Sequence, residues 1–351
     1  MMRKIRIYNL RMLCVMIVFI IAGYAYGEGK TRIVTDLGGR KVEIPIKINT
    51  VFVDKHCAML VYAIAPKMAV NYVFKPSEAA KQYLPKNYCE NKAYTDGSAE
   101  EIIKLHPDII FMADELNPSV IDKANKMQEK VNIPVVLLEM NMFKYKEDLA
   151  FLGDILEKQK EATVLTDFVK TYLDQIQELA LKIPDKEKLK VYYAEGPNGL
   201  NTDPSGSKHS QIIDFTGAEN VAKVGIIPGM GMSQASMEQV LVWQPEIILV
   251  WTGNADQLVT YKYVTSDPLW SNIDAVKKKQ VYQIPWLPFG WFDRPPGTNR
   301  IIGCIWTANL LYPNIYKFDM VKVTREYFQK FYHFDLSEED ARKLLNPKPT
   351  I

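Results

Sequence analysis

Residues 98–110, SAEEIIKLHPDII, and residues 236–248, SMEQVLVWQPEII, follow one pattern and align without a gap. In each copy a serine is placed to cap a helix, and the residue three positions later, Glu101 or Gln239, is placed to complete a capping box. A proline then ends the helix, and a short apolar strand follows. This internal repeat predicts two similar α/β lobes in one chain.

Short apolar runs alternate with helical patterns on both sides of the repeat. The predicted strands are 50–53, 68–72, 108–111 and 135–138 in the first half and 189–194, 247–250 and 281–284 in the second. A hairpin is expected before them, with its turn at Leu37-Gly38-Gly39. Helices are expected at the end of the chain, over 299–311, 319–331 and 338–345. Strands that alternate with helices predict mostly parallel sheets covered on both faces.

Residues 158–183 interrupt this alternation. Apolar residues recur there at three- and four-residue spacing, and Pro184 follows, so one amphipathic helix of about 25 residues is expected. The predicted fold class is therefore α/β, with two Rossmann-like lobes joined by one long interdomain helix. The expected boundaries are 28–157 for the first lobe, 158–183 for the helix, and 184–351 for the second lobe with its C-terminal helices.

The first 27 residues have the pattern of an export signal. Four basic residues lie within the first eleven positions, an uncharged stretch follows over 12–27, and the segment ends on small residues, which predicts cleavage after Gly27. The alternative is a retained membrane anchor, for which the uncharged stretch is short. The only cysteine of this segment, Cys14, lies inside the apolar run, so the pattern is not that of a lipoprotein. A soluble, monomeric periplasmic protein is expected.

Composition excludes several classes of protein. Apolar residues make up 48% of the chain, which excludes disorder, and 43 basic against 41 acidic residues give no general attraction for nucleic acid. After the signal three cysteines remain, Cys57, Cys89 and Cys304, and their spacing is not that of a structural zinc site. At least one of them must be free, and the sequence leaves open whether Cys57 pairs with Cys89.

Two further stretches carry a resemblance to a known family. One is DPSGSKH at 203–209, which leads to FTGAENV at 215–221; the other is GWFDRPP at 290–296, which opens a helix that ends in NLLYP at 309–313. Together with the repeat, they make the chain resemble the periplasmic solute-binding proteins of the ferric-siderophore and cobalamin (Fe/B12) ABC importer class. The resemblance implies a ligand cleft between the lobes. It also implies a partner, a permease dimer with a cytoplasmic ATPase, whose arginines would contact one surface glutamate of each lobe, Glu100 and Glu238.

Candidate ligand-binding residues lie in loops that follow predicted strands, because ligands of doubly wound sheets bind beyond the carboxyl ends of the strands. Histidines suit a metal centre, which makes His56 and His209 candidate metal ligands, and Lys55 and Arg294 suit negative charge. Aromatic residues in the same loops would form the walls of a flat-ligand site. The full candidate set is Lys55, His56, His209, Trp251, Trp291 and Arg294. His106 and His333 are interpreted as parts of the scaffold.

The expected function is the binding component of an ABC importer for a ferric chelate of the siderophore type or a related metal complex. Haem, cobalamin, a nickel or cobalt chelate and a molybdate-type oxyanion stay open as ligands. The sequence contains no GxSxG, HExxH or phosphate-loop motif, so no enzyme is expected and no catalytic cofactor. An exported sensor and a chelatase-like enzyme on the same fold are the alternatives from other classes.

Overall fold

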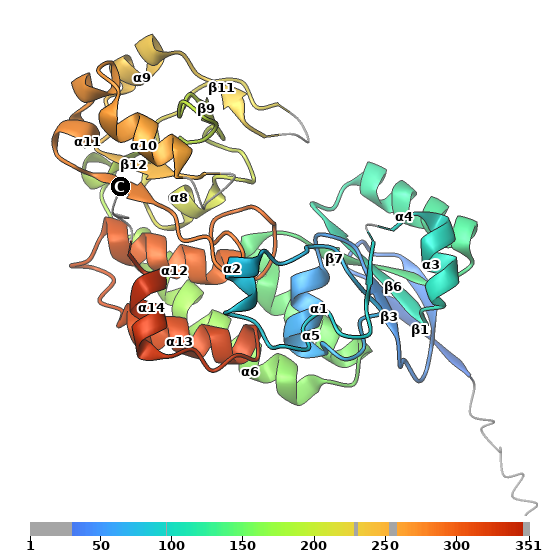
Figure 1. Ribbon diagram of the computed structural model, residues 1–351. Coiled ribbons are helices and arrows are strands. Elements are labelled where there is room, and N and C mark those ends of the chain that lie inside the picture. Colours follow the sequence, from blue (N-terminus) through green and yellow to red (C-terminus); the bar gives the residue numbers. More distant parts are fainter. Residues whose placement is uncertain (1–29, 96, 228–230, 253–257, 347–351) are drawn as a thin grey trace, which may run out of the picture.

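The computed structural model describes residues 30–95, 97–227, 231–252 and 258–346. Figure 1 shows two lobes above a base of helices. The first lobe contains β1 (Thr31–Thr35), β2 (Lys41–Pro45), β3 (Val51–Val53), α1 (Ala58–Ile64), β4 (Asn71–Tyr72), α2 (Glu78–Lys81), β5 (Ala93–Tyr94), α3 (Ala99–Leu105), β6 (Ile109–Asp114), α4 (Pro118–Val131) and β7 (Val135–Glu139). After it come η1 (Met142–Lys144), α5 (Tyr145–Ile155), α6 (Gln159–Val169), η2 (Lys170–Asp174), α7 (Gln175–Ala180) and η3 (Asp185–Glu187).

The second half of the chain repeats the α/β arrangement and then adds three helices. Its elements are β8 (Lys190–Ala194), β9 (Asn201–Thr202), α8 (Gln211–Phe215), β10 (Glu219–Asn220), β11 (Ser233–Gln234), α9 (Met237–Trp243), β12 (Ile247–Val250), α10 (Val259–Ser266), η5 (Trp270–Asn272), α11 (Asp274–Lys277), β13 (Val281–Gln283), α12 (Asn299–Leu311), α13 (Met320–Phe331) and α14 (Glu338–Leu344).

The main sheets of both lobes are parallel, as the alternation predicts. The first lobe has the strand order β3-β6-β7, and the second has β10-β8-β12-β13. The predicted hairpin is confirmed, since β1 and β2 pair in antiparallel register with Thr35 opposite Lys41. The two-lobed α/β fold class predicted from the repeat is therefore the one observed.

Alternate residues of the central strands enter different parts of the core. On β6, Ile109 and Phe111 face a core that continues through the base of the molecule into the second lobe, while Ile110 and Met112 face the core beneath α3 and α4. Strand β8 does the same with Tyr193 and Tyr192. This two-residue period follows from the strand geometry and buries both faces of each sheet. One apolar core thus joins the two lobes.

A single helical run, residues 159–180, lies between the lobes in the sequence. It consists of α6, the π-helical turn η2 and α7, so the predicted straight α-helix contains one π turn. Helix α6 packs against α5, α1 and α13, and η2 packs against α12, so the run contacts both halves of the chain. Gly153 of α5 permits the close approach of α6, because a Cβ there would lie 2.4 Å from the Cβ of Ala162.

The two copies of the repeat form α3 and α9, each followed by a buried strand. Both helices end in a left-handed residue before the proline, His106 in α3 and Gln244 in α9. The reciprocal capping box exists at α9, where the Gln239 side chain accepts from the Ser236 backbone N–H. At α3 the prediction is wrong in detail, because the Glu101 carboxylate accepts from the hydroxyls of Thr95 and Ser98 instead.

The described cysteines form no disulfide. Cys57, Cys89 and Cys304 are all free thiols. Among the described residues, no helix combines the length and the apolar character needed to cross a membrane. The expected export signal and Cys14 lie outside the described residues.

The packing of α12 makes Gly303 a sensitive position for stability. A Cβ at Gly303 would lie 1.6 Å from the backbone oxygen of Trp291, so Gly303→Ala must push the helix away from that segment. We expect the free energy of unfolding to fall by about 2 kcal/mol or more in urea titrations. Gly225→Ala is the matched control, because a Cβ there meets nothing within 4 Å. Equal stability of the two variants would contradict this account of the packing.

Candidate functional site

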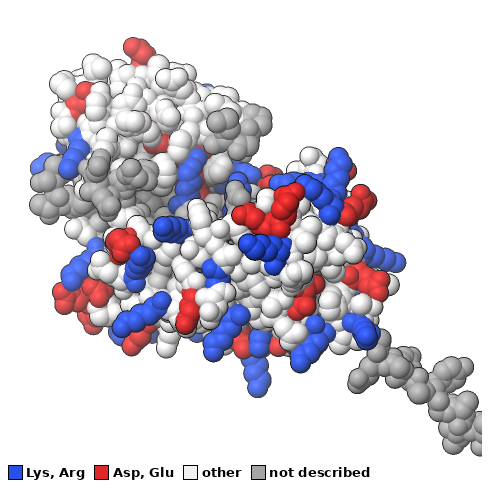
Figure 2. Space-filling model, turned by 45° about the vertical axis from the view of Figure 1, so that its right-hand side comes forward, with Lys and Arg blue, Asp and Glu red and all other residues white. Residues whose placement is uncertain are grey.

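A cavity of about 300 Å3 lies where the two lobes meet. The first lobe contributes residues that follow β3, β6 and β7, and the second contributes the loop before α8 and the segment that leads into α12. Figure 2 shows basic side chains at this junction. The lining residues are Lys55, His56, Asp114, Glu115, Lys123, Met140, Lys208, His209, Asp293, Pro296 and Arg300. Strand ends of the first lobe and loops of the second lobe therefore meet at one cavity.

His56 is held by the ends of two neighbouring strands. The Asp54 carboxylate accepts hydrogen bonds from the backbone N–H groups of His56 and Cys57 and from that of Ala113 at the end of β6. The His56 Nδ1 atom lies 2.7 Å from the Ala113 carbonyl oxygen. A carbonyl can only accept, so Nδ1 carries the proton and donates it. The Nε2 atom is then the one left for a ligand.

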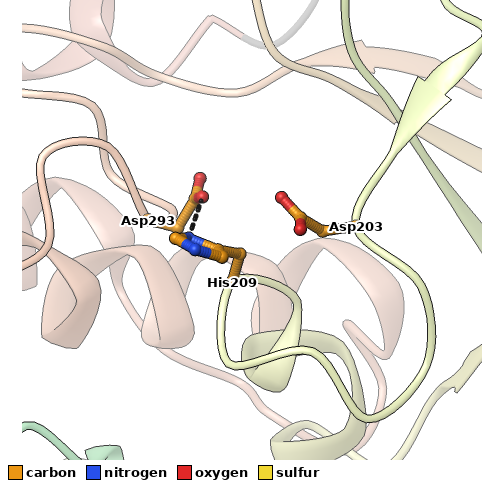
Figure 3. Close-up of side chains that lie close together, drawn as sticks. All are labelled: Asp203, His209 and Asp293. Atoms are coloured by element: carbon orange, nitrogen blue, oxygen red, sulfur yellow. Dashed lines mark hydrogen bonds and ion pairs between the residues drawn. The ribbon is translucent and has the colours of Figure 1, made fainter. Parts of the chain in front are cut away.

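His209 is held in the same way by a carboxylate. Its Nδ1 atom lies 3.0 Å from Oδ2 of Asp293, and Figure 3 shows the imidazole directed toward this oxygen. Nδ1–H is therefore the donor, and Nε2 again has no hydrogen-bond partner among the described residues. A histidine that ligates a metal typically donates its other ring N–H to a carbonyl or carboxylate, and both cavity histidines have this arrangement.

Asp293 belongs to a buried network around Arg294. The guanidinium pairs with Asp293, with Glu195 at 2.6 Å and with Asp203 at 2.8 Å. Burial lowers the pKa of Arg294, but the charge of Asp293 and the hydrogen bond to Asp203 raise it, and the net shift is upward, so the cation persists. The Tyr193 hydroxyl donates to the second oxygen of Asp293 at 2.7 Å.

Three carboxyl groups face this one guanidinium, and protonation of one carboxyl group reduces the excess of negative charge. Burial, followed by the charge of Asp293, raises the pKa of Glu195 well above its usual range. The Glu195 side chain has no exposed surface, and its Oε2 atom has no hydrogen-bond partner. Glu195 is therefore the protonated member of the network at neutral pH.

Asp203, His209 and Asp293 also have the composition of a metal site, since their ligand atoms lie within 4.8 Å of one another (Figure 3). However, both Asp203 oxygens and both Asp293 oxygens already accept hydrogen bonds or ion pairs. The cluster is thus satisfied as an ion-pair network that orients His209.

Comparison with known proteins identifies the class of this site. The sequence pattern of the periplasmic binding protein family matches residues 52–286. The chain belongs to this family. A full-length relative, the molybdate-binding protein MolA of Haemophilus influenzae, is 27% identical over 93% of this chain and 98% of its own length.

Solved structures agree with this assignment. An ABC transporter solute-binding protein from Sulfurospirillum deleyianum is 28% identical, with a TM-score of 0.81 over 89% of this chain and 98% of that one. The molybdate-bound MolA of H. influenzae is 25% identical, with a TM-score of 0.65 over 87% of this chain and 99% of that one. This periplasmic binding protein is therefore a substrate-binding component of an ABC importer and not an enzyme, as the sequence predicts.

The structure brings some of the predicted ligand residues together and not others. Lys55, His56 and His209 line the junction cavity. Arg294 is engaged by its three carboxylates, and its guanidinium lies 5.3 Å from the ring centroid of Trp251. Trp251 is half-buried by this stacking, which places it in the network and not on the cavity wall.

The expectation that Trp291 forms a cavity wall is wrong for this structure. Trp291 is fully buried, and its indole N–H donates to the Leu287 carbonyl at 2.9 Å. Gly303 of α12 contacts its backbone, so the helix covers it. Residues 285–296, which are rich in aromatic residues and prolines, thus pack mostly inward. Only Asp293 and Pro296 of this segment line the cavity.

Several cavity residues were missed by sequence reasoning, among them Asp114, Lys208 and Arg300. Asp114 and Lys208 form an ion pair at 3.3 Å between the two lobes. Burial raises the pKa of Asp114, but a hydrogen bond from the Glu115 backbone and the charge of Lys208 outweigh it, so the pKa is lowered. Arg300 is almost fully buried at the start of α12 and donates to the Lys208 carbonyl at 2.9 Å. Arg300 is the single charged residue in the sequence of α12, and this was the available signal for it.

The Arg294 network generates a test by paired substitutions. Folding at pH 7 must protonate Glu195, which is ionised in the unfolded chain, so Glu195→Gln is expected to leave the free energy of unfolding at pH 7 unchanged or to raise it. Asp293→Asn removes a charge that Arg294 needs, so it is expected to cost about 3 kcal/mol or more. Urea titrations compare the two variants.

The same titrations have a definite pH dependence. The folded state holds the Glu195 proton at pH values where the unfolded state has released it, so this group's stabilisation falls as pH rises between the two pKa values. Glu195→Gln should remove that slope. A loss from Glu195→Gln equal to that from Asp293→Asn would show that Glu195 is ionised in the folded protein.

Proposed function

We propose that this protein binds molybdate or a similar small metal oxyanion and delivers it to the permease of an ABC importer. The observation that carries the proposal is the pair of histidines, one from each lobe, whose Nε2 atoms are left free in one small basic cavity. A protonated imidazole donates its Nε2–H to an oxyanion oxygen, and a neutral imidazole offers a lone pair to the metal atom. Both forms suit a metal oxyanion.

Charge and size support the same ligand class. Among the charged lining residues, Lys208 neutralises Asp114, and Arg294 behind the wall neutralises Asp293, which leaves Lys55, Lys123 and Arg300 against the single acid Glu115. A volume of about 300 Å3 is at the lower end for small-molecule sites, which disfavours cobalamin and haem. The full-length relative MolA is named as molybdate-binding, which agrees with an oxyanion in this cavity.

A ferric or other chelate is the second candidate, and one observation favours it. A neighbouring cavity of about 260 Å3 shares Lys55, His56, Asp114 and Lys123 with the first and extends beneath α3 and α4. Apolar side chains such as Phe52, Ile102 and Met127 line its inner part. An apolar portion of a chelator would fit there, with its metal centre beside His56.

Calorimetric titration of the purified protein distinguishes these ligands. We expect molybdate and tungstate to bind, and both a ferric catecholate complex and sulfate to bind at least tenfold more weakly. His56→Ala and His209→Ala should each weaken molybdate binding at least tenfold, about 1.4 kcal/mol, without lowering the melting temperature. His106→Asn is the control. His106 lies at the opposite end of the sheet, and its left-handed backbone conformation is one that asparagine also adopts. Tight binding of the ferric complex with none for molybdate would reject the oxyanion proposal.

Docking onto the permease is proposed to use Glu100 and Glu238. Both carboxylates are exposed in the first turns of the repeat helices α3 and α9, one on each lobe. This placement fits a permease dimer that presents one basic patch to each lobe.

Charge reversal at both positions tests this assignment. We expect Glu100→Arg combined with Glu238→Arg to abolish molybdate uptake by cells in which this double variant is the only form of the protein, because like charges repel at the interface. Molybdate affinity of the purified protein should stay unchanged. The matched control is Glu129→Arg combined with Glu187→Arg, which makes the same charge change at exposed positions elsewhere. Normal uptake by the first double variant would show that these glutamates do not dock.

A further inference from the structure

A larger cavity, of about 560 Å3, lies away from the lobe junction. It sits at the C-terminal end of α1, where Pro66 and Lys67 follow the helix, whereas His56 of the junction cavity precedes the same helix. The loop of residues 85–92 and the end of α13 form its other walls. The two cavities share no lining residue.

Aromatic rings form the walls of this second cavity. The rings of Tyr62 and Tyr88 meet edge to face at 5.3 Å between centroids, and Tyr332 lies on the α13 side. Phe289 packs behind them, 6.0 Å from Tyr88 and 6.0 Å from Tyr332. The Tyr62 hydroxyl donates to the Asn71 carbonyl at 2.6 Å, which fixes the ring in place. This rigid set of rings offers apolar surface to a planar ligand.

The basic groups at the cavity are Lys67, Lys92 and His333. Lys92 Nζ donates to the Tyr88 carbonyl at 2.9 Å and lies 6.0 Å from the Tyr62 ring centroid. Burial lowers the pKa of Lys92, and the charges of Cys89 and Glu90 offset this only in part. Among the described residues, neither Lys92 nor Lys67 forms an ion pair with a carboxylate. His333 Nε2 lies 3.1 Å from the Tyr62 carbonyl and donates to it.

A half-buried ammonium group without a carboxylate is costly, and an anion that enters the cavity would supply the missing partner. Glu90, the one acid among the lining residues, is exposed and does not reach Lys92 as an ion pair. The ammonium group of Lys92 has N–H groups left to donate, and the cavity walls are flat aromatic rings. A ligand that matches both features carries a negative group attached to a ring.

We propose that this cavity is a binding site for a small aromatic carboxylate, with its ring against the tyrosine wall and its carboxylate paired with Lys92. The volume falls within the usual range for small-molecule sites, which combine mostly apolar walls with a few directed polar groups. The site is separate from the junction cavity and does not depend on what that cavity binds.

Calorimetric titration of the intact protein with benzoate tests this proposal, with benzamide as the uncharged analogue. We expect benzoate to bind at least tenfold more tightly than benzamide, because only benzoate can form the ion pair. Lys92→Gln should weaken benzoate binding at least tenfold. Lys86→Gln is the matched control, since Lys86 is an exposed lysine of the same loop that does not line the cavity. Melting temperatures establish that both variants are folded.

A second arm separates the two sites. Titration of benzoate into protein saturated with molybdate should give the same affinity as without molybdate. No binding of benzoate at millimolar concentration, or equal binding of benzoate and benzamide, would overturn the proposal. So would an unchanged affinity in Lys92→Gln, or competition by molybdate, because each would place benzoate elsewhere. Failure of molybdate to bind at the junction would leave the benzoate result unaffected.

Discussion

The guanidinium of Arg294 is the group on which the lobe junction depends. It joins three buried segments of the second lobe: the end of β8 through Glu195, the loop after β9 through Asp203, and its own segment through Asp293. A buried cation is tolerated only when it is paired, so these segments must meet at one point. With Glu195 protonated, the carboxylates of Asp203 and Asp293 hold Arg294, and Asp293 also accepts the hydrogen bond that orients His209.

In the first lobe, His56 is oriented by fewer charged groups than His209 is in the second. Asp54 joins the ends of β3 and β6 through backbone N–H groups, and the Ala113 carbonyl then fixes His56. Both lobes therefore present a histidine whose Nδ1 atom is occupied. The Lys208–Asp114 ion pair is the contact that crosses between them. Because it is partly exposed, it contributes little stability, and a ligand that competes for Lys208 could replace it at small cost.

The base of helices fixes how the two histidines face each other. The core that begins at Val53 and Phe111 in the first lobe continues to Tyr193 and Leu249 in the second without a break. Close approaches at Gly153 and Gly303 bring α6 against α5 and α12 against the segment at Trp291. Helix α1 starts beside the junction cavity and ends beside the tyrosine-walled cavity, so one short helix separates two sites of different chemistry.

The sequence by itself determined the elements whose signals are local. The strands, the capped repeat helices with Glu100 and Glu238, and the positions of His56 and His209 after strands all follow from periodicity and from the parallel-sheet rule. Helix α5 was not predicted, and the structure buries Asp148 in it. Burial raises the pKa of Asp148 to about 8, so it is neutral there, while in a sequence an aspartate indicates exposure.

Only the tertiary structure decided which polar groups meet. Asp293 is the neighbour of Arg294 in the sequence, but Glu195 and Asp203 are 99 and 91 residues away from Arg294, and no local pattern marks these two as its partners. The same holds for Trp291, whose loop position suggested a cavity wall but which α12 covers through the missing side chain of Gly303. Local periodicity determines secondary structure, whereas pairing of buried charge and close packing depend on long-range contacts that one sequence does not show.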